Sequence, residues 1–186
     1  MSVPMSEAKS TLRRLMLTRL RSLPKAQATA WSAEVVARLE AAPAFASAGT
    51  VLLYHSLPIE VDVRPLLLRW VDKKRLLLPA VVGDDLELRT FAGPDSLAPG
   101  AFGILEPTGP AFTDLSAIDL VIVPGVAFDA RGGRLGRGKG YYDRLLPRLG
   151  RARKWGVCYP IQFLEAVPTD PHDVRMDEVI TCRLSE

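Results

Sequence analysis

Hydrophobic residues along the chain alternate between two spacings, and this alternation predicts which segments are helices and which are strands. Residues 6–22 and 25–41 carry apolar residues at a helical spacing, and Pro43 is expected to close the second helix. The period changes at 50–54, TVLLY, a short continuous apolar run that is typical of a strand buried on both faces. The chain is therefore expected to begin with two helices and a buried strand.

The same alternation continues to the end of the chain. Residues 119–123, DLVIV, form the clearest buried strand, whereas 93–117 are rich in Pro, Gly and Ala and are expected to form a surface loop or arm. Further strands are expected at 75–82, 86–91, 154–158 and 179–183, and further helices at 63–71 and 141–149. Helices that alternate with strands predict an α/β fold, a mainly parallel sheet covered on both faces, in one domain over residues 1–186.

Composition narrows the class of protein. With 48% hydrophobic and 24% charged residues, the chain is neither disordered nor collagen-like. Two cysteines and two histidines argue against a disulfide framework and a structural zinc site. No apolar run approaches the ~20 residues of a membrane helix, and the first twenty residues lack the apolar segment of a secretory signal. A cytoplasmic protein without a membrane partner is therefore expected.

Charge is informative only where it is concentrated. The net charge is +3, from 24 basic and 21 acidic residues, which does not indicate a surface coated with basic charge for nucleic acid. Between residues 131 and 140, however, four cations alternate with five glycines. This segment is the first candidate for chemistry.

In open α/β sheets, ligands lie beyond the carboxyl ends of the strands, and two loops occupy that position here, 55–62 and 124–140. Glycines in the second loop allow positive φ and close approach of backbone N–H groups, which form an anion-binding nest, and arginines add forked donors. The loop also leads into a helix near Tyr141, whose amino end favours anions. All three features indicate a bound phosphate.

The spacing of the glycines also limits the kind of phosphate site. Residues 133–139 satisfy the first seven positions of a P-loop, G-x-x-x-x-G-K, but Gly140 stands where a P-loop has Ser or Thr. A P-loop NTPase is therefore disfavoured, and Asp143 is the nearest candidate for a magnesium ligand. A solvated basic loop and an RNA-binding Gly/Arg stretch remain alternatives, although this loop follows a buried strand and opens a helix.

The two runs PGVAFD at 124–129 and GRLGRGKGYYD at 133–143 closely resemble the signature of the 5-formyltetrahydrofolate cyclo-ligases, also called methenyltetrahydrofolate synthetases. The resemblance implies an enzyme that uses ATP and Mg2+ to convert 5-formyltetrahydrofolate to 5,10-methenyltetrahydrofolate. It also implies a three-layer α/β sandwich of the type shared with sugar-phosphate isomerases and CoA transferases. Small-molecule substrates, a monomer and no nucleic-acid partner are expected.

The resemblance further implies roles for individual residues. ATP is expected to contact Lys9 and Arg13, one turn apart on the first helix, and the loop residues Arg134, Leu135, Gly136, Arg137, Gly138, Lys139, Gly140, Tyr141 and Tyr142. The catalytic cations among them are Arg134, Arg137 and Lys139. The folate is expected to contact His55, Glu60, Phe102 and Tyr141, and the magnesium ligands are Asp143 and Asp173.

Without the resemblance, the residues alone favour simpler interpretations for several of these positions. Lys9 and Arg13 would belong to a solvated helix face, and Asp173 to a solvated acidic turn. Two other classes of protein also remain. One is a different small-molecule enzyme on the same scaffold, such as a phosphosugar isomerase or a CoA transferase. The other is a non-enzymatic nucleotide- or RNA-binding module.

Overall fold

A six-stranded sheet forms the centre of the computed structural model, which describes residues 4–100 and 103–182. Its strands lie in the order β11 (Glu178–Ile180), β9 (Arg153–Val157), β6 (Leu120–Val123), β1 (Thr50–Leu52), β2 (Arg75–Val82) and β3 (Asp85–Thr90). All neighbours are parallel except β2 and β3, which form an antiparallel pair at one edge. The mixed α/β fold with a mostly parallel sheet is confirmed.

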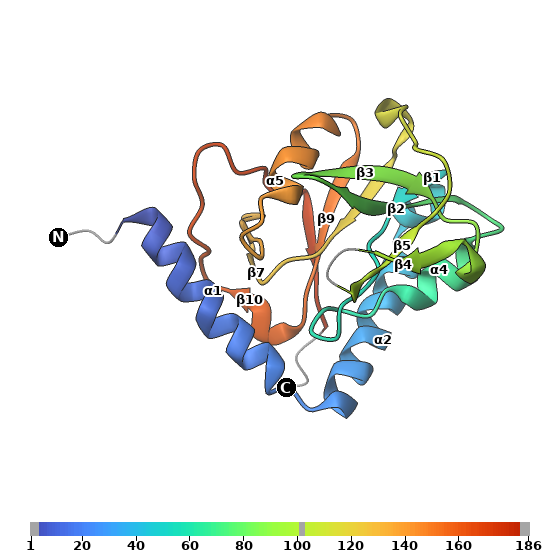
Figure 1. Ribbon diagram of the computed structural model, residues 1–186. Coiled ribbons are helices and arrows are strands. Elements are labelled where there is room, and N and C mark those ends of the chain that lie inside the picture. Colours follow the sequence, from blue (N-terminus) through green and yellow to red (C-terminus); the bar gives the residue numbers. More distant parts are fainter. Residues whose placement is uncertain (1–3, 101–102, 183–186) are drawn as a thin grey trace.

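Both faces of this sheet are covered. Neighbouring residues of a strand point to opposite faces, so each buried strand contributes to two cores. Val51 and Leu76 pack into one core with α2 (Lys25–Ala41), α3 (Pro43–Ser47) and α4 (Arg64–Trp70). Leu52 and Leu77 pack into a second core, on the side of α5 (Tyr141–Leu145). The result is three layers, with α2 and α4 on one side of the sheet and α5 on the other (Figure 1).

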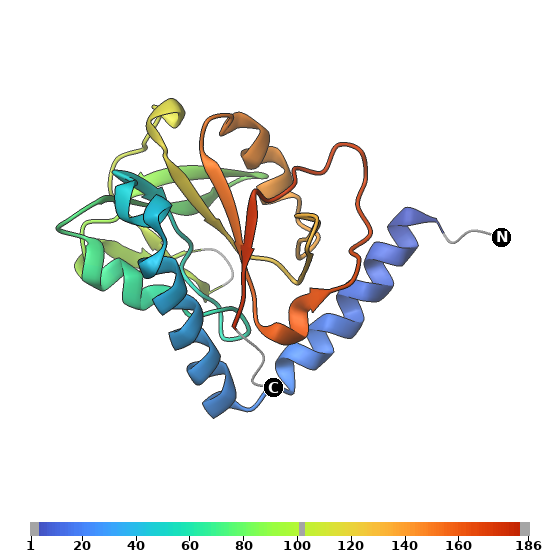
Figure 2. The same cartoon turned by 180° about the vertical axis from the view of Figure 1, so that it is seen from behind.

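The first helix, α1 (Met5–Arg21), diverges from α2 at the turn before Lys25, so that the two helices form a V in both views (Figures 1 and 2). Its buried Met16 packs against a small sheet of β10 (Phe163–Leu164), β7 (Ala127–Asp129) and β8 (Arg134–Leu135). Helix α1 is thereby attached to the glycine-rich segment, while its Leu20 joins the core that α2 forms with the central sheet. Within the described residues, no helix is both long and apolar enough to cross a membrane.

The segment 93–117 differs from the prediction, which assigned it no regular element. Strands β4 (Leu97–Pro99) and β5 (Leu105–Pro107) pair antiparallel, between the short 3-10 helices η1 (Pro94–Ser96) and η3 (Leu115–Ala117). Each strand has only three residues and ends in proline, so neither leaves a hydrophobic pattern that could be recognised. The prediction of an arm without regular structure is therefore wrong.

Prolines account for two further differences. Pro43 was expected only to end a helix, but it occupies the first turn of α3, where its missing N–H needs no partner. The helix expected over 141–149 stops at Leu145 and continues as the 3-10 turn η4 (Leu146–Arg148), which contains Pro147. The glycine-rich loop itself contains β7 and β8, and η5 (Pro160–Gln162) leads into β10, elements too short for a periodicity to indicate.

Candidate active site

The two loops singled out from the sequence lie together. Strand β1 pairs with β6, so the loops that follow them meet at the same edge of the sheet. They line a cleft of about 390 Å3, whose other wall is formed by Pro79, Val81, Leu86, Ile104 and Glu106. The first loop contributes Tyr54, His55, Leu57 and Glu60. The second contributes Pro124, Gly125, Arg134 and every residue from Gly136 to Asp143.

The start of the glycine-rich loop is held by one buried carboxylate, Asp129, which is 2% exposed. Its Oδ1 accepts hydrogen bonds from the N–H groups of Arg131 and Gly133, at 2.9 and 2.8 Å, and its Oδ2 accepts one from Val167 at 2.8 Å. Burial opposes ionisation, but these three N–H donors lower the pKa of Asp129 below its usual value. The backbone before Arg134 is therefore anchored by a charged acceptor.

Two glycines of the loop are required by its geometry. Gly132 has φ +78°, and a Cβ there would lie 2.2 Å from the carbonyl oxygen of Met176. Gly138 has φ +94°, and a Cβ there would touch the guanidinium carbon of Arg13 at 3.4 Å. The alternation of glycines with cations thus reflects close backbone packing as well as positive φ.

Arg134 is the most enclosed cation of the cleft, with a side chain that is 5% exposed. Its Nη2 lies 2.5 Å from Asp143 Oδ1, and its Nη1 donates to the carbonyl oxygen of Pro124 at 3.2 Å. The guanidinium also lies 5.6 Å from the centre of the Tyr142 ring. These contacts fix Arg134 in one orientation at the base of the cleft.

Arg137 and Glu60 connect the two loops across the cleft. Arg137 Nη1 lies 3.6 Å from Glu60 Oε1, and the other carboxylate oxygen accepts the N–H of Leu57 at 2.9 Å. Burial raises the pKa of Glu60, and the Leu57 N–H and the charge of Arg137 partly offset that rise. The carboxylate from one loop and the guanidinium from the other therefore face the same space.

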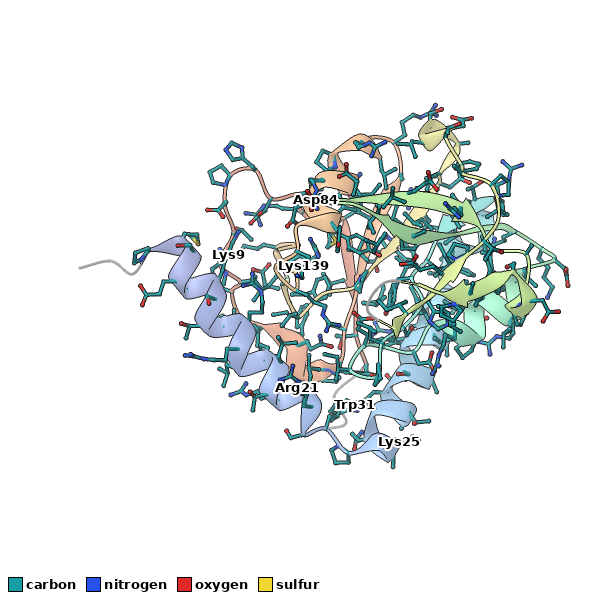
Figure 3. All side chains as sticks on the ribbon, in the orientation of Figure 1. Lys9, Arg21, Lys25, Trp31, Asp84 and Lys139 are labelled. Atoms are coloured by element: carbon teal, nitrogen blue, oxygen red, sulfur yellow. The ribbon has the colours of Figure 1, made fainter. Side chains whose placement is uncertain are left out.

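Helix α1 reaches the same site from outside the cleft. Arg13 Nε donates to the carbonyl oxygen of Gly136 at 2.9 Å. Lys9 Nζ lies 2.6 Å from Asp170 Oδ2 and 2.5 Å from Asp173 Oδ2, and Figure 3 shows Lys9 on the side of α1 that faces Lys139. The expectation that Lys9 and Arg13 share a helix face agrees with these contacts, whereas a fully solvated face does not.

The two expected magnesium ligands lie beside cations. Asp143 pairs with Arg134, and Asp173 pairs with Lys9. Burial opposes ionisation of Asp173, but hydrogen bonds from Lys9 and from the Asp170 N–H lower its pKa. No group of three or more His, Cys, Asp or Glu side chains that could hold a metal occurs in residues 4–100 and 103–182. Two carboxylates nevertheless suit Mg2+ chemically, because this ion commonly takes one or two of them together with substrate phosphates and waters.

The remaining expected residues divide into three groups. His55, Tyr141 and Tyr142 line the cleft, and burial together with Arg64 lowers the pKa of His55. Leu135 does not line it, since its side chain packs with Met16 beneath α1. Phe102 lies outside the described residues.

Three acidic residues of this region received no role from the sequence. Asp129 stands in the recognised motif but carries no sign that it accepts three backbone N–H groups. Asp170 contacts Lys9, and Glu106 lines the cleft while accepting the Val81 N–H at 3.2 Å. Asp170 and Glu106 lie in different segments from their partners, and the nearby partners of Asp129 are backbone N–H groups, so residue spacing gives no signal for any of the three.

Comparison with known proteins finds a family and several relatives that match over most of this chain. A model of the 5-formyltetrahydrofolate cyclo-ligase family matches residues 5–182. A probable 5-formyltetrahydrofolate cyclo-ligase from Schizosaccharomyces pombe is 31% identical over 95% of this chain and 96% of that protein. The NMR structure of the Aquifex aeolicus 5,10-methenyltetrahydrofolate synthetase superposes with a TM-score of 0.85 at 38% identity, covering 96% of this chain and 93% of that one. A synthetase from Mycoplasma pneumoniae, at 24% identity and a TM-score of 0.76, shares the fold over 94% of this chain and 99% of its own.

Proposed function

This chain belongs to the 5-formyltetrahydrofolate cyclo-ligase family, and we propose that it converts 5-formyltetrahydrofolate and ATP to 5,10-methenyltetrahydrofolate, ADP and phosphate. One observation carries the proposal beyond the family match. Arg137 of the cationic loop (residues 124–140) and Glu60 of the acidic loop (residues 55–62) lie 3.6 Å apart across a single cleft. The cationic wall suits the phosphate donor and the acidic wall suits the folate, and the reaction needs both substrates in one cleft.

The chemistry explains why both substrates must share the cleft. The N5-formyl group is an amide, so its carbon is a weak electrophile and its oxygen a poor leaving group. In the proposed first step the formyl oxygen attacks the γ-phosphorus, and the bond from that phosphorus to the β-phosphate bridging oxygen breaks to release ADP. In the second step N10 attacks the activated carbon and loses its proton, and the carbon–oxygen bond breaks to release phosphate as the ring closes.

The cationic loop serves the first step. Phosphoryl transfer depends chiefly on positioning and on neutralising charge at the equatorial oxygens. Arg137 and Lys139 are exposed residues of the loop that line the cleft, and Arg134 lies beneath them, fixed by Pro124 and Asp143. Preorganised donors of this kind need little reorganisation during the reaction. Lys9 and Arg13 would hold the more distant part of ATP, because they approach the loop from α1.

The acidic loop serves the second step by orienting the folate. A carboxylate accepts neighbouring N–H groups of a pterin through charge-assisted hydrogen bonds, and Glu60, whose side chain is 12% exposed, supplies a carboxylate to the cleft wall. His55 and Tyr141 would contact the same substrate, as would Phe102. Ring closure then becomes a matter of holding N10 near the formyl carbon, an orientation effect that requires no side-chain nucleophile.

Asp143 and Asp173 would hold Mg2+ when it is bound, and the ion would supply positive charge to the phosphates of ATP. Both carboxylates pair with cations that we assign to ATP, Arg134 and Lys9. If the metal and the nucleotide bind together, each carboxylate would contact the metal and each cation would contact ATP, in place of these ion pairs. We therefore expect the magnesium complex of ATP, rather than free ATP, to be the form that these residues accept.

The proposal also includes the fold type, the domain organisation, the cellular location and the oligomeric state of the enzyme. The three layers support a fold of the sugar-phosphate isomerase and CoA transferase type, in one domain over residues 1–186. A cytoplasmic monomer that acts on small molecules fits the reaction.

The decisive experiment mixes the protein with MgATP and 5-formyltetrahydrofolate and follows the absorbance of the methenyl product. ADP, phosphate and methenyltetrahydrofolate should appear in equal amounts, and omission of either substrate should abolish all three. Consumption of ATP without methenyl product would contradict the proposal. RNA binding that weakens with salt, in the absence of folate turnover, would instead favour a binding module.

A further inference from the structure

The short segment after β9 that runs from Tyr159 to Gln162 contacts both loops of the cleft. Neither of these two residues lines the cleft itself, and each is only 2% exposed. The Tyr159 N–H donates to Gln162 Oε1 at 2.8 Å, and the Gln162 N–H donates to the carbonyl oxygen of Tyr159 at 2.9 Å. The two residues therefore form one buried, hydrogen-bonded unit.

Tyr159 holds the acidic loop. Its hydroxyl donates to the carbonyl oxygen of Glu60 at 2.7 Å and lies 3.1 Å from Ser32 Oγ. Since a tyrosine hydroxyl has only one hydrogen, the serine donates in the second contact, and it also accepts the N–H of Asp62 at 3.0 Å. The backbone on both sides of Val61 is thereby fixed to Tyr159 and to α2.

Gln162 holds the start of the cationic loop. Its Nε2 donates to the carbonyl oxygens of Gly125 and Val126, at 2.9 and 3.2 Å, while its Oε1 accepts the N–H described above. Both ends of the amide are engaged, so its partners determine the orientation of the side chain. The preceding carbonyl oxygen, that of Pro124, accepts Arg134 Nη1 at 3.2 Å. Gln162 and the most enclosed cation of the cleft are therefore attached to consecutive residues of the chain.

We propose that Tyr159 and Gln162 are positioning residues that set the distance between the two loops. This inference rests on the proposed function, because that function assigns one substrate to each loop. The formyl oxygen reaches the γ-phosphorus only if the folate, held at Glu60, and the phosphate, held at Arg134, are aligned. A buried network whose members are all hydrogen-bonded provides a rigid link for this purpose. Alignment is an orientation effect, so a small displacement lowers the rate of reaction without weakening the binding of either substrate.

The test separates the chemical step from binding. Tyr159→Phe keeps the ring, whose centre lies 5.9 Å from that of the Trp31 ring, but removes the hydrogen bond to the acidic loop. Gln162→Met keeps a side chain of similar length and removes the hydrogen bonds to the cationic loop. In single turnovers with enzyme in excess, each variant should form the methenyl product roughly tenfold more slowly. The dissociation constants of MgATP and of 5-formyltetrahydrofolate, each measured alone, should change by no more than about twofold.

A double variant and a control test whether the two residues act as one link. Because loss of either set of bonds releases the same alignment, Tyr159→Phe combined with Gln162→Met should be no slower than the slower single variant. Asp119→Ala is the matched control. It removes the acceptor of the Gly49 and Thr50 N–H groups, at 2.8 and 2.9 Å, at the opposite ends of β1 and β6 from the cleft. It should lower the thermal unfolding temperature and leave the single-turnover rate unchanged.

Other results overturn the inference. Variants that keep the single-turnover rate would show that the link is not needed for alignment. A loss that appears as weaker binding of one substrate would assign the residue to that substrate alone, and losses that multiply in the double variant would be two independent effects. An unmodified protein that forms no methenyl product would contradict the proposed function itself. Thermal unfolding measures the folded fraction of each variant, and Tyr159→Phe decides the question if Gln162→Met does not fold.

Discussion

The loops that follow β1 and β6 lie side by side, yet they are held in opposite ways. Side chains hold the acidic loop together, with the Tyr54 hydroxyl donating to Val61 O at 2.8 Å and Ser56 Oγ accepting the N–H of Val63 at 3.0 Å. Backbone conformation holds the glycine-rich loop, with positive φ at three of its glycines and one carboxylate, Asp129, accepting two of its N–H groups. One loop presents several cations, and the other presents one buried carboxylate.

This difference separates the two substrates. A phosphate is recognised by many donors that act together, so both backbone N–H groups and side chains of the cationic loop are expected to contact it. A pterin edge is recognised by one well-placed acceptor, so Glu60 is expected to be the main contact from the acidic loop. Substitutions in one loop should therefore change chiefly the kinetics of one substrate, except at the contact between Arg137 and Glu60, which joins the two loops.

The largest effect is expected from Lys139→Ala. Removal of a cation that stabilises transferring phosphate should lower kcat/KM for ATP roughly 100- to 1,000-fold. Folate binding measured by titration in the absence of ATP should be unchanged. Arg148→Ala removes an exposed cation outside the cleft and serves as the control. Near-normal turnover of the Lys139 variant would remove this loop from phosphoryl transfer.

Glu60→Gln should give the mirror image of that result. Gln keeps an acceptor for the Leu57 N–H but loses the charge, so KM for the folate should rise roughly 10- to 100-fold. KM for ATP should change by no more than about twofold, since the ATP contacts lie on the other loop. Steady-state kinetics with each substrate varied in turn measures both values. A larger rise in KM for ATP than for folate would place Glu60 outside the folate site.

Asp129→Asn tests whether the cationic loop depends on its buried anchor. The amide would bring N–H groups against backbone N–H donors, so the variant should lose about 2 kcal/mol of unfolding free energy at neutral pH. Because the pKa of Asp129 is lowered in the folded state, its contribution is present above the ordinary carboxyl range and is lost as the pH falls through that lowered pKa. Denaturant unfolding of the two proteins should therefore converge in strong acid. A constant difference at every pH would show that the carboxylate charge is not what anchors the loop.

The same contrast explains what could be predicted from the sequence. The glycine-rich loop leaves a compositional trace, because close backbone packing at Gly132 and positive φ at Gly132 and Gly138 favour glycine, and phosphate requires cations. Buried strands such as 119–123 likewise leave a continuous apolar run. Both features could be recognised from the residues alone.

Single partners from distant segments leave no such trace. Glu60 became a candidate only through the family resemblance, and Asp129, Asp170 and Glu106 received no role at all. Their importance lies in pairings with residues up to 161 positions away, such as Lys9 with Asp170, which only the folded chain creates. Short elements such as β4 and β8 were missed for a related reason, because two or three residues cannot display a period.

The smallest expected effect is a shift in the pH profile that tests the contact between the two loops. Arg137→Ala removes this contact and also lowers turnover, because Arg137 is a cation of the phosphate site. Arg137 favours the ionised form of Glu60, whose pKa burial has already raised, so loss of the guanidinium should raise that pKa further. If ionised Glu60 binds the folate, kcat/KM for the folate falls as the pH drops through this pKa. The acid limb of the normalised profile should therefore move to higher pH. Arg137→Lys restores a cation and should return the limb toward its original position, whereas Lys139→Ala should leave it in place. An acid limb that stays fixed in the Arg137→Ala variant would mean that the two loops act independently, each on its own substrate, without this ion pair to couple them.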